Sequence, residues 1–159
     1  MRRAVWVLVA VVAVLVTVGV FAGIGVHKAS NANAKDDDRQ RIALLAGKYA
    51  VDFTSVDYRH LQEDFDAASK NATEEFAKKY LATVQVFAPI YTKGKVVQTT
   101  SVALAGVSSL TPTSAVVLVA LKGVATNTKT TIGTKQLFRM QMSLTKVGDR
   151  WLTSNVVPL

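Results

Sequence analysis

The pattern of hydrophobic and polar positions divides the chain into two unequal parts. Residues 4–26 read AVWVLVAVVAVLVTVGVFAGIGV and contain no charged side chain. At about 1.5 Å per helical residue, this run is long enough to cross the roughly 30 Å hydrocarbon core of a bilayer. We therefore expect residues 4–26 to form a transmembrane helix that precedes a domain outside the membrane.

The charges beside the apolar run predict its orientation. Arg2 and Arg3 lie on the short side, and basic residues favour the cytoplasmic side of a membrane helix. Residues 1–3 are then a cytoplasmic tip, residues 27–35 a linker and residues 36–159 an extracytoplasmic domain of a single-pass protein of the cell membrane. The alternative is a cleaved signal peptide, because Ala32-Asn33-Ala34 resembles a cleavage site. The apolar run is, however, longer than the roughly 7–15 residues of a signal-peptide core.

Apolar residues at helical spacing predict three helices in the first half of the domain. The first begins at Asp36-Asp37-Asp38, where negative charge suits the positive end of the helix dipole. We read Thr54-Ser55-Val56-Asp57 as a capping box that opens the second helix. The third opens at Asn71-Ala72-Thr73-Glu74 and is ended by Pro89 and then Lys93-Gly94-Lys95. Its buried side is expected to carry four residues at helical spacing: Phe76, Tyr80, Val84 and Phe87.

After Gly94 the pattern becomes typical of strands. Val96 to Val107 is rich in Val and Thr. The unbroken apolar run from Ala115 to Leu121 predicts a central strand that is covered on both faces. Phe138 to Leu144 alternates apolar with polar residues, and a turn at Val147-Gly148-Asp149-Arg150 leads into the last strand. The expected fold is α+β, with about three helices packed on one face of a curved four-stranded antiparallel sheet.

Charge is distributed unevenly along the domain. The net charge is +8, and residues 76–159 contain ten basic side chains but only one acidic residue, Asp149. A basic surface favours an anionic partner, such as membrane lipid, an envelope polymer or another protein; alternatively, it only keeps the domain soluble. No nucleic-acid recognition motif occurs, so we expect no nucleic-acid partner. The candidate docking face consists of four lysines expected in loops or at strand ends: Lys93, Lys95, Lys122 and Lys129.

The sequence contains no recognisable catalytic or metal-binding motif. There is no cysteine, which excludes disulfides and thiolate metal sites. The two histidines, His27 and His60, lack companions at metal-ligand spacing. Asp52, Asp57 and Tyr58 could in principle form an acid–base set in a concave pocket, but no phosphate-binding loop or nucleophile elbow accompanies them. We predict no catalytic, cofactor-binding or metal-binding residue, and hence a protein that is not an enzyme.

Several segments together resemble a known family. They are Val51-Asp52-Phe53-Thr54-Ser55-Val56-Asp57-Tyr58, Asn71-Ala72-Thr73-Glu74-Glu75-Phe76, the apolar strand from Ala115 to Leu121, and Gly148-Asp149-Arg150-Trp151-Leu152. With the preceding apolar run, their order resembles the Mce-associated membrane proteins of actinobacteria. That family is similar to the VirB8-like and NTF2-like proteins. At the start of the third helix, this chain has Lys70-Asn71-Ala72-Thr73 where many relatives have a glycine-containing turn.

The resemblance implies a cone-shaped α+β domain outside the membrane and a non-enzymatic accessory role. Such a protein would stabilise or scaffold an Mce-type lipid import complex, with Mce transporter components or other envelope proteins as partners. A homo-oligomer is left open. The alternatives are a VirB8-like scaffold of a secretion or conjugation machine and an NTF2-like domain that binds or converts a small molecule. The resemblance assigns no catalytic residue and no cofactor.

The orientation of the membrane helix is directly testable. With residues 1–3 in the cytoplasm, a reporter that is active only outside the cytoplasmic membrane should be active when fused after Leu159. A cytoplasm-dependent reporter at the same position should be inactive. The opposite pattern of activity would reverse the predicted orientation.

Overall fold

The computed structural model describes residues 36–159, and residues Arg39–Leu159 form one compact unit. The predicted cytoplasmic tip (1–3), transmembrane helix (4–26) and linker (27–35) lie outside the described residues. Among the helices within 36–159, none is long and apolar enough to span a bilayer. The elements are a first helix (residues 36–54), β1 (Val56–Asp57), α2 (Leu61–Ser69), α3 (Glu74–Gly94), β2 (Val97–Leu110), β3 (Ser114–Thr126), β4 (Thr134–Val147) and β5 (Arg150–Pro158).

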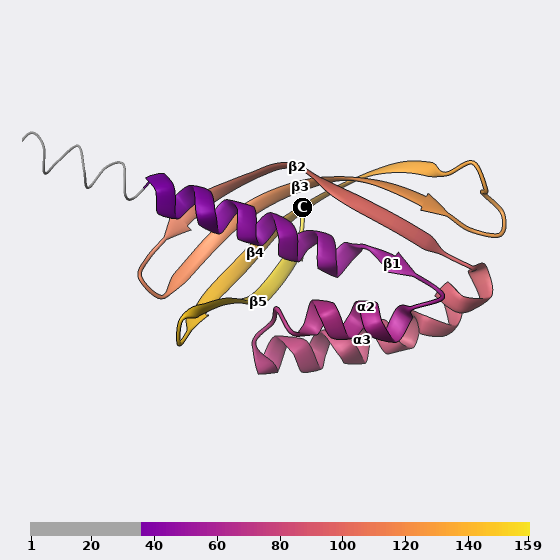
Figure 1. Cartoon of the computed structure of the whole chain (residues 1–159), viewed down its shortest axis with the longest axis horizontal. Coiled ribbons are helices and arrows are strands. Elements are labelled where there is room, and N and C mark those ends of the chain that lie inside the picture. The colour runs from indigo at the N-terminus through magenta and orange to yellow at the C-terminus, as the bar shows by residue number, and fades with distance from the viewer. Residues whose placement is uncertain (1–35) are drawn as a thin grey trace, which may run out of the picture. The chain divides into compact units, whose positions relative to one another are not determined.

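The strands form one antiparallel sheet in the order β1-β2-β3-β4-β5, and the first helix runs along it (Figure 1). The α+β class is confirmed, but the expected four-stranded sheet is wrong by one strand. The additional strand is β1, which pairs Val56 with Gln98 and Asp57 with Val97. Beyond this short pairing, the outer edge of β2 is contacted by side chains: the Arg39 guanidinium donates to the Val107 carbonyl oxygen at 2.8 Å.

The predicted capping box does not cap a helix, because its first two residues form hydrogen bonds with β2. The Thr54 hydroxyl lies 2.8 Å from the Thr100 hydroxyl, and the Ser55 hydroxyl oxygen accepts the Thr100 N–H at 3.2 Å. These polar groups join the first helix to the edge of β2, so they are not available to the N–H groups of a following helix. The second helix begins only at Leu61, and its N-cap residue His60 makes no capping hydrogen bond through its side chain.

The core lies between the first helix and the face of the sheet that it covers. The helix contributes Ile42, Ala46, Tyr49 and Ala50 at helical spacing, all buried. Gly47 allows a close approach to β2, because a Cβ at this position would lie 3.0 Å from Cγ2 of Val102. The strands contribute alternate residues, as expected for a sheet with one face toward the helix. These residues are Ala115, Val117, Val119, Leu121, Met140, Met142 and Leu144.

β3 is central, as predicted, but it is not covered on both faces. Its buried residues alternate with less buried ones, and Leu118 is 45% exposed. In the part of the chain that the structure describes, the helices pack on only one side of the strand. An unbroken apolar run is typical of a strand with two buried faces. The run in β3 therefore predicted a second layer on the other face of the strand, and the described residues do not form one.

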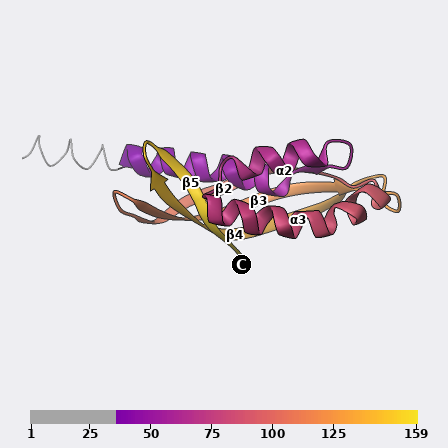
Figure 2. The ribbon, with the colours of Figure 1, turned by 90° about the horizontal axis from the view of Figure 1, so that it is seen from below.

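α2 and α3 lie side by side (Figures 1 and 2). The Thr73 hydroxyl accepts the Phe76 N–H as the N-cap of α3, and the ring of Tyr80 makes edge contacts with Phe53 and Phe65. Phe87 was expected on the buried side but is 46% exposed, because these ring contacts involve the N-terminal half of α3. The helix continues through Pro89 and ends at Gly94, where Lys95 adopts the left-handed conformation with φ of 48°.

The one-sided cover of β3 predicts different costs for two leucine truncations on the same strand. Leu121 is fully buried, so Leu121→Ala should lower the free energy of unfolding by about 2–5 kcal/mol. The matched control Leu118→Ala should cost less than about 1.5 kcal/mol, because less apolar surface is removed from contact. Urea denaturation of a soluble fragment starting at Ala29 measures both. Equal losses would mean that the strand is covered on both faces.

Candidate functional site

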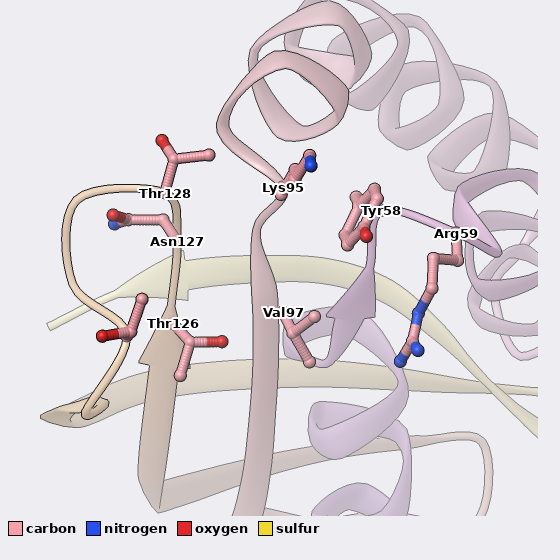
Figure 3. A pocket seen from close by; sticks show the side chains of 8 residues that line it. Tyr58, Arg59, Lys95, Val97, Thr126, Asn127 and Thr128 are labelled. Atoms are coloured by element: carbon pink, nitrogen blue, oxygen red, sulfur yellow. The ribbon is translucent and has the colours of Figure 1, made fainter.

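A groove lies at the end of the sheet where β1, the end of α3 and the β3–β4 loop meet. Its volume is about 340 Å³. Tyr58 and Arg59 form one side, and the loop after β3 forms the other, with Val97 between them (Figure 3). The lining residues are Tyr58, Arg59, Lys95, Val97, Thr126, Asn127, Thr128 and Thr131.

Backbone pairing fixes the two sides of this groove. Val97 and Thr126 are directly opposite each other in the β2–β3 ladder. The Thr128 N–H donates to the Gly94 carbonyl oxygen at 2.8 Å, which attaches the β3–β4 loop to the end of α3. The Asn127 side-chain oxygen accepts the Lys129 N–H at 2.8 Å and therefore closes a local turn, a role that short polar side chains commonly have.

Of the four lysines of the predicted docking face, one lines the groove and two are next in the chain to residues at its border. Lys95 lines the groove. Lys93 precedes Gly94 and Lys129 follows Thr128, the two residues joined by the backbone hydrogen bond. We call Lys93, Lys95 and Lys129 the groove lysines; all three are exposed. Lys122 is separate, because it lies within β3 opposite Ser101 of β2 and Leu137 of β4.

An ion pair organises the segment on the opposite side of the groove. The Arg59 Nε–H donates to Oδ1 of Asp57 at 2.9 Å, and the guanidinium lies 5.9 Å from the centre of the Tyr58 ring. Hydrogen bonding to Arg59 lowers the pKa of Asp57 to about 2. The Asp57 N–H donates to Oδ2 of Asp64 at 2.8 Å, which ties β1 to α2. Asp57 therefore balances one of the two cations of the lining.

The other polar residues considered from the sequence do not form a reactive set with Asp57. Asp52 accepts a hydrogen bond from the Asn71 amide at 2.9 Å, and burial raises the pKa of its carboxyl group. His60 is exposed, and its Nδ1 lies 3.5 Å from a Glu63 oxygen. Within residues 36–159, no group of three or more His, Asp or Glu side chains is arranged to hold a metal ion.

The lining is suited to binding an anionic group. It presents an ammonium group, a guanidinium group, threonine and tyrosine hydroxyls and an amide, and no carboxylate is among its residues. Cations and polar donors of these types bind carboxylate and phosphate oxygens. Sequence reasoning identified Lys95 and considered Tyr58 for a concave pocket, but it did not identify the other residues of the groove. The polar run from Thr126 to Gly133 predicts a loop, whereas the attachment of this loop to Gly94 depends on a contact between distant parts of the chain.

Comparison with solved structures defines the class to which this fold belongs. An IcmL-like type IV secretion system protein from Legionella pneumophila is 13% identical, with a TM-score of 0.62 over 76% of this chain and 93% of that protein. The periplasmic domain of DotI is 14% identical, with a TM-score of 0.60 over 74% and 92%. VirB8 of Agrobacterium tumefaciens is 12% identical, with a TM-score of 0.55 over 74% and 89%. The domain therefore has the VirB8-like α+β fold.

Sequence comparison identifies the family of the chain. The chain belongs to the family described as uncharacterized protein Rv1363c/MT1408-like, which matches residues 3–158. A relative in Mycobacterium tuberculosis, uncharacterized protein Rv1363c, is 25% identical over 151 residues. That match covers 93% of this chain and 58% of the relative, so the chain spans less than two thirds of the relative's length. The resemblance to Mce-associated proteins stays a prediction.

The ion pair at the groove predicts a measurable titration. Because the folded-state pKa of Asp57 lies below its ordinary value of 3.8, the pair stabilises the fold above that value, and its contribution is lost as the pH falls through about 2. Arg59→Ala should raise the pKa of Asp57 toward 3.8, as followed by NMR of the side-chain carboxyl carbon. Arg139→Ala, in β4, is the matched control and should leave the pKa low. An unchanged pKa in Arg59→Ala would contradict the ion pair.

Proposed function

We propose that this protein is a non-enzymatic, membrane-anchored scaffold that holds partner proteins in an assembly of the cell envelope. The observation that carries the proposal is the division between the filled inner side of the domain and its exposed basic groove. The inner side is closed by apolar side chains of the first helix and the sheet. Binding groups instead gather at the surface, where a partner has access to them.

The packing on the inner side argues against an enzyme of the NTF2-like kind. Such an enzyme needs reactive polar side chains that face a cavity. The inward positions of β4 are occupied by Met140, Met142 and Leu144, which are buried. The nearby Tyr49 hydroxyl donates to the Trp151 carbonyl oxygen at 3.1 Å and has a structural partner. This arrangement favours a binding role over a catalytic one.

The groove lysines are suited to an acidic segment of a partner protein. Exposed charges steer association and contribute to specificity, and their effect weakens as salt increases. The predicted anchor in residues 4–26 would hold the groove near membrane partners and raise their effective concentration. We expect the chain to be single-pass, with residues 1–3 in the cytoplasm and the groove outside it.

Two kinds of envelope assembly fit this role. A secretion or conjugation machine is supported by the fold shared with proteins named as type IV secretion components. An Mce-type lipid importer is supported by the sequence resemblance described above. The fold likeness favours the first assembly, and the partner proteins recovered from membranes distinguish the two.

Affinity purification of the full chain from membranes tests the scaffold role. The wild type should recover a defined set of envelope proteins, identified by mass spectrometry. Lys93→Glu, Lys95→Glu and Lys129→Glu together should remove most of that set without loss of helical signal by circular dichroism. Mce subunits in the recovered set would assign the lipid importer, and channel or pilus components would assign the secretion machine.

The matched control is the triple change Lys70→Glu, Lys78→Glu and Lys79→Glu. It alters net charge by the same amount at exposed positions after α2 and near the start of α3, away in the chain from the end of α3 and the β3–β4 loop. The control should retain the partners. If both triple variants lose their partner proteins equally, the effect comes from net charge and not from the groove. If the wild type recovers no envelope protein, the scaffold role is contradicted.

A further inference from the structure

The sheet has a second face that the first helix does not cover. Residues alternate between the two faces along each strand, so the neighbours of the buried positions of β3 and β4 point to this second side. Leu118 and Val124 of β3 and Leu137 of β4 are among its exposed apolar residues. We call this side the outer face and define it by Leu104, Val116, Leu118, Ala120, Lys122, Val124, Lys135, Leu137, Arg139, Gln141 and Val157.

The register of the strands joins these residues into a continuous surface. Leu104 of β2 is opposite Ala120 of β3, and Ala120 is opposite Arg139 of β4. Leu118 is opposite Gln141, which is opposite Val157 of β5. Leu104 and Leu137 are each 71% exposed. The outer face therefore presents aliphatic side chains from four strands, next to one another and open to solvent.

Basic residues are interspersed with the aliphatic ones. Lys122 is opposite Leu137, Lys135 is opposite Val124, and Arg139 is opposite Ala120. All three basic residues are exposed. The sequences of β2, β3, β4 and β5 contain no Asp or Glu. The outer face is thus apolar and positively charged, without a carboxylate on its strands to balance the charge.

This charge distribution disfavours a second copy of the chain as the occupant of the outer face. Packing the same surface on itself would place Lys122, Lys135 and Arg139 of both copies in one interface. Like charges brought together without intervening carboxylates repel one another, and burying them adds a desolvation cost. The partner of this face should instead carry negative charge and accept aliphatic side chains.

Of the partners that meet both requirements, the observations favour a lipid surface. Protein-binding surfaces concentrate their affinity in Trp, Tyr and Arg, and the outer face defined above has a single Arg and no aromatic residue. Exposed apolar side chains contribute to binding at the headgroup boundary, and basic residues beside them are attracted to anionic lipid. The predicted linker, residues 27–35, would keep the domain within about 30 Å of the bilayer at roughly 3.3–3.6 Å per residue.

We propose that the outer face docks on an anionic phospholipid surface. Leu104, Leu118 and Leu137 rest at the boundary between headgroups and acyl chains, and Lys122, Lys135 and Arg139 contact lipid phosphates. The inference goes beyond the scaffold role, because it concerns lipid contact and does not require any partner protein. It places the sheet, rather than the helices, against the membrane.

The natural sequence has no cysteine, so a single introduced cysteine reports on one position. The full chain carrying Leu137→Cys is labelled with an environment-sensitive fluorophore and reconstituted into vesicles. One set of vesicles is pure phosphatidylcholine, and the other contains about a third phosphatidylglycerol. Gln85→Cys, exposed on α3, is the matched control. Brominated lipids then measure contact with acyl chains through quenching.

The Leu137 label should shift to shorter wavelength and be quenched in the anionic vesicles, and less so in the neutral ones. The Gln85 label should change little in either. Raising salt from about 0.1 M to about 1 M shortens the Debye length from about 10 Å to about 3 Å and should reverse most of the effect. Lys122→Glu, Lys135→Glu and Arg139→Glu together should abolish it, whereas the triple change at Lys70, Lys78 and Lys79 should not.

Three results would overturn the proposal. The first is a Leu137 label that stays solvent-exposed on anionic vesicles. The second is equal quenching at both label positions, which would indicate only general proximity to the bilayer. The third is protection of Leu137 that appears only after a membrane-protein extract is added, which would assign the outer face to an acidic protein partner. Each result is independent of partner recovery in the purification described above.

Discussion

The packing of the first helix against the inner face of the sheet determines the rest of this structure. Ala46 and Ala50 are fully buried, and the small side chains at these positions allow the helix to lie close to β3 and β4. Gly47 allows the same approach to β2 near Val102. The partners on the sheet are large and fully buried, including Leu121, Met142 and Leu144. Removal of this apolar surface from water is the main favourable term for the domain.

The same packing determines which surfaces of the domain stay exposed and could bind a partner. Because apolar side chains fill most of the inner side, the charged groups of the sheet lie at its ends and on the outer face. The groove depends on the hydrogen bond between Thr128 and Gly94, and the outer face depends on the strict alternation along β3 and β4. The two proposed anionic partners, an acidic protein segment at the groove and lipid at the outer face, would therefore bind separate surfaces without disturbing the core.

The sequence predicted the elements that local periodicity specifies. The three helices, the central position of β3 and the alternation in β4 follow from spacings within each segment. The predicted capping box was wrong because the hydroxyl groups of Thr54 and Ser55 form hydrogen bonds with Thr100, a residue distant in the chain. The prediction that β3 is covered on both faces was wrong for a related reason. An apolar run indicates that side chains avoid water, but it does not specify whether a helix, a membrane or another protein covers them.

The candidate site was predictable only in part. Lysines in loops are visible in a sequence, and one of the four predicted lysines, Lys95, lines the groove. Lys93 and Lys129 are chain neighbours of the hydrogen-bonded residues Gly94 and Thr128, and the role of all four lysines in docking stays a prediction. The association of Lys95 with Tyr58 and Arg59 depends on β1, whose two residues carry no periodic signal. Lys122 was grouped with the others by its place near a strand end, whereas β3 extends to Thr126 and places Lys122 within the sheet. Strand length, rather than residue type, was the missing information.

The most direct test of this account is the chemical accessibility of alternate positions along β3. Single cysteines at Val117, Leu118, Val119 and Ala120 are introduced into the full chain, and their labelling by a maleimide is timed in detergent solution. Because only one face of β3 is covered, labelling should be fast at Leu118, slower at Ala120 and slowest at Val117 and Val119. Uniformly slow labelling at all four positions in the isolated protein would contradict this account, because both faces of the strand would then be covered within the chain itself.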